Sequence, residues 1–237
     1  MTWHAKPTGI YSHLSEEATD NAQEIAAILI NDYGWTLEAA AGAIGNMYYE
    51  VQLNPWRWES DHLLTKQQAI DGYVPSGWHY SPGYGLIGWT PARKYQINNA
   101  STSGGIIWFP DYDQESYFGY GPNWSDIAGS VMDGAAQVKL LAEAMSRGSG
   151  NIWVHRQGHL SASQYIRINT TPEYAASEFW YGAEYSASSE SIPERQGYAR
   201  DYYDWLVEHG WQPSGGNLFQ LMMFIIALIS SKWLFKL

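Results

Sequence analysis

Apolar side chains recur at helical spacing in five separate stretches of the chain, and this pattern decides the fold class. Most of these stretches have a typical helix boundary, a Ser or Thr before the start or a Gly after the end. The intervening residues 55–125 are dense in Gly, Pro, Trp and Tyr, which predicts loops with at most a small hairpin. We therefore predict a mainly α domain with helices at 15–34, 36–50, 125–147, 171–181 and 194–209.

The C-terminal stretch has a different character from the rest of the chain. A linker-like Pro213-Ser214-Gly215-Gly216 precedes residues 218–237, which carry only the charges of Lys232 and Lys236. As a helix this stretch would be about 30 Å long, close to the thickness of a bilayer core. We expect a domain at residues 1–212, a linker at 213–217 and a hydrophobic tail at 218–237. The tail either contacts a membrane or packs on the domain or a partner subunit, and its hydropathy favours the membrane.

Composition narrows the function classes. The 237 residues include no Cys, which excludes a disulfide scaffold, thiolate metal sites and a Cys nucleophile. Thirteen Lys and Arg stand against 24 Asp and Glu, and a net charge of −11 argues against a nucleic-acid partner. No apolar run follows Lys6, so we expect no signal peptide. The 13 Trp and 18 Tyr exceed what a core needs and favour a surface that stacks on sugars.

One carboxyl lies on the apolar face of the second predicted helix. Ala43, Met47 and Glu50 follow one another at spacings of four and three, which places them on one side. A charge there must be paired or neutralised, and a carboxyl partly withdrawn from water keeps its proton more readily, as a general acid must. Asn46 lies one turn earlier and could orient Glu50. Alternatively, Glu50 points outward or bonds the backbone at the Asn54-Pro55 turn.

Two sequence blocks carry a resemblance to a known family. Residues 45–55 read GNMYYEVQLNP and residues 83–93 read GYGLIGWTPAR, and a late segment runs from Phe179 to Glu184. In this order they resemble the phage tail lysozyme family, virion-borne peptidoglycan hydrolases with a goose-type lysozyme-like, mainly helical domain. The resemblance covers about residues 20–205 and implies that Glu50 is the catalytic acid of glycan cleavage.

The chain departs from the family pattern at two positions. Val51 stands where the family usually has Ser, and Gly88 stands where it usually has Gln. The missing polar side chains could alter substrate contacts or weaken activity. The peptidase activity attached to some members is not expected, since this chain has an apolar tail in its place.

A second carboxyl is the usual companion of the acid in glycoside hydrolysis. The acids of the loop-rich region are candidates, and we favour Asp61 because it follows Trp56-Arg57-Trp58; the alternative is a solvated loop acid. The other candidates are Glu59, Asp71, Asp111 and Asp113. The resemblance also allows one carboxylate with a positioned water, or internal attack that yields an anhydro sugar. Hydrolysis and lytic transglycosylation both remain open.

Aromatic rings of the same region are the predicted sugar platforms. A ring face can lie against a pyranose, and neighbouring glycines let backbone amides approach acetamido groups. Together with Asn46 we predict substrate contacts for Tyr84 and Trp89, followed by Trp56, Trp58 and Trp78. Packing in the core or in loops is the alternative for each ring.

Three further motifs do not support a cofactor or a metal. Residues 83–88 match G-x-G-x-x-G, but flanking prolines argue against the strand and helix that this fingerprint needs. His155 and His159 have zinc-helix spacing with Arg156 in place of the required Glu. Residues 111–115 alternate oxygen ligands without EF-hand spacing. We expect no cofactor and no metal.

The resemblance implies a place for the protein in the phage tail. It would open the bacterial cell wall while the genome enters, with peptidoglycan and other tail proteins as partners and the host membrane as a further one through residues 218–237. Two alternatives remain. The chain could be a glycan-binding tail component without turnover, or a membrane-perforating structural protein with the domain as a plug.

Overall fold

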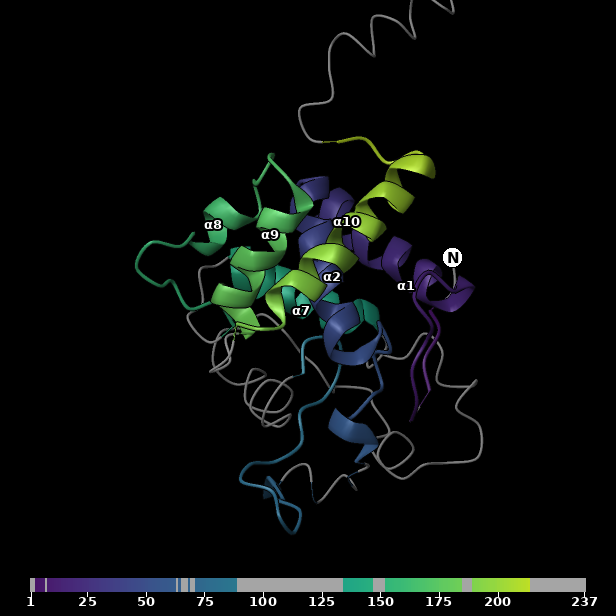
Figure 1. Ribbon diagram of the computed structural model, residues 1–237, viewed down its shortest axis with the longest axis vertical. Helices are drawn as coiled ribbons and strands as arrows, with labels where there is room; N and C mark the ends of the chain where they lie inside the picture. Colours follow the sequence, from purple (N-terminus) through teal and green to yellow (C-terminus); the bar gives the residue numbers. More distant parts are fainter. Residues whose placement is uncertain are drawn as a thin grey trace, which may run out of the picture.

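The computed structural model describes residues 3–6, 8–62, 64, 68, 71–88, 134–146, 152–184 and 189–213. These ranges fold into helices around a central helix α2 (Figure 1). They contain no β-strand, only one antiparallel bridge between Trp58 and Tyr84. The predicted mainly α fold is confirmed. The elements are α1 (Glu16–Ala27), η1 (Ile28–Asp32), α2 (Leu37–Val51), η2 (Glu59–Asp61), α7 (Gly134–Ser146), α8 (Ala162–Tyr165), α9 (Pro172–Phe179), η4 (Trp180–Glu184) and α10 (Ile192–Glu208).

Local capping fixes the first two long helices where the sequence predicts them. The Ser15 hydroxyl accepts a hydrogen bond from the Ala18 amide, and the Thr36 hydroxyl accepts one from the Ala39 amide. Each bond satisfies one of the free N–H groups of a helix N-terminus. Helix α1 continues through the π-helical turn η1 and ends before Gly34, as expected.

Helix α2 is the central, buried helix of the molecule. All of its residues are buried except Tyr49 and Glu50. It makes its most extensive helix contacts with α10 and α9, which lie against it in Figure 1. Two glycines permit this approach: a Cβ on Gly42 would lie 2.5 Å from the Ala175 Cβ, and a Cβ on Gly45 would lie 2.6 Å from the Ala199 backbone nitrogen.

The later helices differ from the prediction mainly at their ends. Helix α9 passes directly into the π-helical turn η4, so the helical run ends at Glu184, three residues beyond the predicted end. Helix α10 begins at Ile192, two residues early. The short helix α8 was not predicted; it rests on a capping box between Ser161 and Gln164. Helix α7 falls inside the predicted 125–147, whose first part, 125–133, lies outside the described residues.

After α2 the chain turns away from the helices. Gln52 and Leu53 both adopt positive φ, 50° and 57°, which ends the helix and redirects the backbone. The segment that follows is drawn in blue and extends below the helices in Figure 1. It is linked to itself by the Trp58–Tyr84 bridge, where the two rings lie 4.7 Å apart.

The predicted tail lies outside the described residues, as does the linker from residue 214 onward. Within the described ranges no helix combines the length and the hydrophobicity that a bilayer crossing requires. The division into domain, linker and tail therefore stays a prediction.

Candidate active site

A cleft of about 910 Å³ opens at the C-terminal end of α2. Its walls come from the end of α2, from the segment after it and from the chain between η4 and α10. Many of its lining residues are polar or charged, which suits a sugar more than an apolar ligand. The lining residues are Tyr49, Glu50, Val51, Gln52, Arg57, Glu59, Ser60, Tyr80, Gly83, Gly88, Glu184, Glu190, Ser191 and Arg195.

Glu50 lies in this cleft and is paired with Arg195 of α10. One guanidinium nitrogen of Arg195 donates to the Glu50 Oε1 in an ion pair. The side chain of Glu50 keeps 29% of its surface exposed, whereas that of Arg195 keeps 5%. The structure thus supplies the partner that a carboxyl on the apolar side of α2 requires, and it leaves that carboxyl within reach of a ligand.

Arg195 is fixed by contacts on several sides. Its Nη1 donates to the Asn46 Oδ1 at 2.9 Å, and its Nε donates to the Ser191 Oγ at 3.1 Å. The guanidinium also lies over the ring of Tyr49, 4.2 Å from the ring centre. Such a planar fork, bonded at several atoms and stacked on an aromatic ring, has one orientation in which to meet Glu50.

Asn46 lies in the core behind the cleft and contacts Arg195. It is fully buried and is not among the cleft-lining residues. Its amide nitrogen donates to the carbonyl oxygens of Gly42, at 2.8 Å, and Ala176, at 3.0 Å, which leaves its oxygen for Arg195. Asn46 therefore orients Glu50 through Arg195, and its placement does not support direct contact with a sugar.

A second carboxyl in the cleft belongs to Glu184, the last residue of η4. Its Oε1 is buried, and no hydrogen-bond partner for it lies within the part of the chain that the structure describes. Burial raises the pKa of Glu184 well above its usual value, the negative charge of Glu50 adds to the rise, and Arg195 partly offsets it. Glu184 is therefore a carboxyl whose surroundings favour its neutral form, beside the Glu50–Arg195 pair.

The opposite wall is built around Glu59. Its Oε1 accepts from the Tyr80 hydroxyl at 3.1 Å and its Oε2 accepts from the Gly83 amide at 3.0 Å. The charge of Glu59 raises the pKa of the Tyr80 hydroxyl. Tyr80 keeps 50% of its surface exposed, so its ring is available at the cleft.

Gln137 of α7 supports the loop that ends in this wall. Its buried amide accepts from the Leu86 amide at 2.8 Å and donates to the Pro55 carbonyl at 2.6 Å. The loop brings Gly88 beside Glu50: a Cβ at Gly88 would lie 3.6 Å from the Glu50 Oε2, in ordinary van der Waals contact. A longer side chain at this position would therefore start next to the carboxyl.

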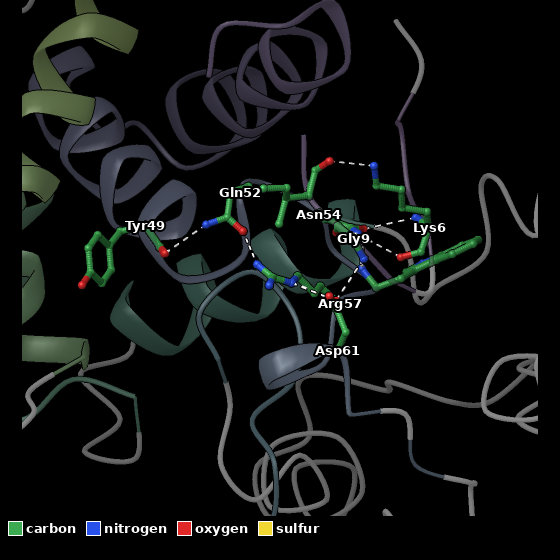
Figure 2. Close-up of polar contacts among 9 residues, drawn as sticks. Lys6, Gly9, Tyr49, Gln52, Asn54, Arg57 and Asp61 are labelled. Atoms are coloured by element: carbon green, nitrogen blue, oxygen red, sulfur yellow. Dashed lines mark hydrogen bonds and ion pairs between the residues drawn. The ribbon is translucent and has the colours of Figure 1, made fainter. Parts of the chain in front are cut away.

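Asp61 lies in a polar network that joins the N-terminal segment to the turn after α2 (Figure 2). Its Oδ1 accepts from the Gly9 amide at 3.0 Å and from the Arg57 Nε at 3.1 Å, and Arg57 also bonds Gln52. Asn54 bonds the backbone of Lys6 and Gly9 in the same network. Asp61 is not among the residues that line the cleft, so its role as second carboxyl stays a prediction without support from its placement.

The predicted sugar platforms are mostly inside the protein. Trp56, Trp58 and Tyr84 are buried, and the cleft is not lined by their rings. Trp78 packs near His62 and Tyr80, with ring centres 5.4 and 5.9 Å away. These aromatic residues pack the segment beneath the wall. Trp89, Asp111 and Asp113 lie outside the described residues.

Sequence reasoning missed four contributors: Arg195, Glu184, Gln137 and Tyr80. For Arg195 a signal existed, since a carboxyl on an apolar helix face calls for a cation and the chain has only 13 Lys and Arg. Glu184 was named only as the end of the late segment. Nothing in the local sequence marks Gln137 or Tyr80, because their contacts are with residues far along the chain.

Comparison with known proteins agrees with this architecture. Morphogenesis protein 1 of Bacillus phage B103 is 38% identical over 89 residues, which cover 38% of this chain and 20% of that protein. The match thus spans about a fifth of the relative. The sequence model of the phage tail lysozyme family matches residues 20–206, a range that includes the cleft and all of the described helices except the first turn of α1 and the last two residues of α10. The chain belongs to the phage tail lysozyme family.

Proposed function

We propose that the protein cleaves the β-1,4 glycan backbone of bacterial peptidoglycan in this cleft, with Glu50 as the general acid. One observation carries the proposal. Helix α2 buries every residue except Tyr49 and Glu50, and the Glu50 carboxyl enters a large polar cleft beside a fixed guanidinium. Membership of a lysozyme family adds the class of reaction.

In the proposed reaction Glu50 donates a proton to the glycosidic oxygen as the bond from that oxygen to C1 breaks. Arg195 then faces the carboxylate that remains and stabilises it. Either a water molecule or the C6 hydroxyl of the same sugar adds to C1. The first route is hydrolysis and the second gives an anhydro sugar, so the products distinguish them.

Tyr80 and Tyr49 are the rings that we propose for sugar contact, since both line the cleft. Tyr80 offers an exposed face on the wall opposite α2. Trp89 directly follows Gly88 in the sequence and stays part of the proposed binding surface. Trp56, Trp58 and Tyr84 support this surface from inside.

We further propose that the protein works in the virion. A relative carries the name of a morphogenesis protein, and the family is one of phage tails. Other tail proteins would be its assembly partners, and cleavage would open the wall as the genome enters. Residues 218–237 would contact the host membrane; liposome flotation that is unchanged when they are deleted would contradict that part.

The test of the central activity is sugar release from purified Gram-positive peptidoglycan by wild type and Glu50→Gln. We expect the wild type to release fragments and the variant to lose at least about 100-fold in rate. Glu208→Gln is the matched control, because it removes the same charge at the exposed end of α10, about 20 Å from Arg195 along the helix.

Three results would contradict the proposal. Equal release by both proteins would assign the acid to another carboxyl. No release by either protein, with retained binding to the wall, would favour the non-catalytic glycan-binding alternative. Membrane leakage without sugar release would favour the perforating alternative.

A further inference from the structure

The cleft contains two carboxyls and one guanidinium in a single electrostatic group. Glu50 comes from α2, Glu184 from the end of η4 and Arg195 from α10. The charges of both Glu50 and Arg195 act on Glu184. Arg195 gives its ion pair to Glu50, while the Glu184 Oε1 is buried with no hydrogen-bond partner in the described part of the chain.

This arrangement has one negative charge too many if both carboxyls ionise. Two carboxylates near one cation retain a proton between them to a higher pH than either would alone. The remaining charged groups of the cleft do not correct the excess, since Glu59 and Glu190 are acidic and Arg57 is bonded to Gln52 and Asp61. Tyr49 and Tyr80 add rings, not cations.

The Arg195 guanidinium that contacts Glu50 binds a carboxylate more strongly than it binds a neutral acid. The proposed reaction needs the opposite, a proton in the cleft near neutral pH. Glu184 resolves this conflict, since it is the carboxyl whose burial favours the neutral form.

We propose that Glu184 is a positioning residue that keeps one proton in the cleft for Glu50, the two carboxyls sharing that proton beside Arg195. This inference rests on the proposed glycan cleavage. In the resting site the proton is on Glu184 and the ion pair is on Glu50.

The Glu50–Glu184 carboxyl pair loses one proton and regains one proton in each catalytic cycle. The proton passes from Glu184 to Glu50, directly or through solvent in the cleft, and then to the glycosidic oxygen as the bond to C1 breaks. The attacking water or C6 hydroxyl forms the new bond to C1 and gives up a proton, which returns to the carboxyl pair. No other co-reactant is needed.

The first test is the pH dependence of sugar release by wild type, Glu184→Gln and Glu208→Gln. The Gln side chain in Glu184→Gln has the shape of the neutral acid, but it has no acidic proton to transfer to Glu50. We expect the alkaline loss of its activity to occur at a pH at least about one unit lower than in wild type. At acidic pH its rate should approach that of wild type. Glu208→Gln should follow the wild-type profile.

A loss of activity that is equal at all pH values would assign Glu184 a merely structural role and overturn the inference, while the proposed function would stand. An unchanged profile would overturn it as well. Glu184→Ala is the second variant; it should shift the profile in the same direction, since the shift depends on loss of the carboxyl.

A second readout is independent of activity. The raised pKa of Glu184 means that the folded protein binds a proton that the unfolded chain releases above about pH 4.5, so this carboxyl costs stability progressively as pH rises. Glu184→Gln removes that cost. The melting temperature of the variant should therefore gain on wild type from about pH 4.5 to pH 8.

The melting-temperature difference between Glu208→Gln and wild type should change little over the same pH range. If wild type releases no sugar, the proposed function fails and the melting temperatures still decide on Glu184. A melting-temperature difference between Glu184→Gln and wild type that grows with pH supports a proton held by Glu184. A difference that does not change with pH overturns the inference.

Discussion

Arg195 joins α2 to the start of α10 at the cleft. Its guanidinium bonds Glu50 and Asn46 on α2, bonds Ser191 just before α10 and lies over the Tyr49 ring. Each of these contacts uses a different atom or face of the planar group. A lysine would bring the same charge to the site without the same geometry.

We expect Arg195→Lys to lose most of the sugar release, at least about tenfold, and about 1–3 kcal/mol of unfolding free energy, because a single ammonium cannot serve Glu50 and Asn46 in the same geometry. The matched control is Arg200→Lys, an exposed position on the same helix with ion pairs of 3.9 Å to Glu173 and Asp201. That change should cost less than about 0.5 kcal/mol. Full activity in Arg195→Lys would contradict the role of the guanidinium fork.

At the scale of residues, the sequence predicts the carboxyl but not its surroundings. Glu50 could be found because helical spacing places it on the apolar side of α2. Arg195 is 145 positions away, and no local pattern specifies that pairing. The aromatic residues were misleading for a physical reason, since a loop-rich segment needs its own core and uses Trp56, Trp58 and Tyr84 to make it.

Close packing of α2 against α10 sets the position of the cleft wall. A Cβ on Gly45 would lie 2.6 Å from the Ala199 nitrogen and 2.7 Å from the Arg195 carbonyl oxygen, both of them backbone atoms. Backbone cannot rotate away as a flexible side chain can. Any side chain at position 45 must therefore push α10 outward, and Arg195 moves with it.

Gly45→Ala should thus lower the unfolding free energy by about 1–3 kcal/mol through overpacking, and activity should fall because the Arg195–Glu50 pair is displaced. Gly197→Ala on α10 is the matched control, since nothing lies within 4 Å of its Cβ position. There the alanine should stabilise by about 0.5–1 kcal/mol, as in an ordinary helix interior. Thermal melts of both variants check the pair, and a neutral Gly45→Ala would contradict this view of the α2–α10 contact.

At the scale of elements, helix starts follow from local signals and helix ends less so. Ser15, Thr36 and Thr171 each bond the first turn of the helix that follows, so the sequence locates α1, α2 and α9 well. The continuation of α9 into η4 depends on distant chain, for example on the Val154 amide that donates to the Gly182 carbonyl at 2.8 Å. Because that contact is non-local, the placement of Glu184 could not be predicted.

The whole molecule carries a net charge of −11, which bears on how it approaches its substrate. Bacterial walls that contain anionic polymers repel such a protein at long range, and salt screens this repulsion. We expect binding to whole cell walls to stay constant or increase when ionic strength rises from about 0.05 M to about 0.5 M. A pull-down series checks this, and a steep loss of binding with salt would contradict it by showing that attraction between opposite charges dominates.

The central claim is that glycan is cleaved at the Glu50 carboxyl in the cleft at the C-terminal end of α2. The most direct measurement is a crystal structure of Glu50→Gln with a peptidoglycan oligosaccharide. We expect a glycosidic oxygen within about 3 Å of the substituted side chain, with the sugar chain between the Tyr80 wall and the η4–α10 wall. An oligosaccharide bound elsewhere, with the cleft free of sugar, would contradict the account.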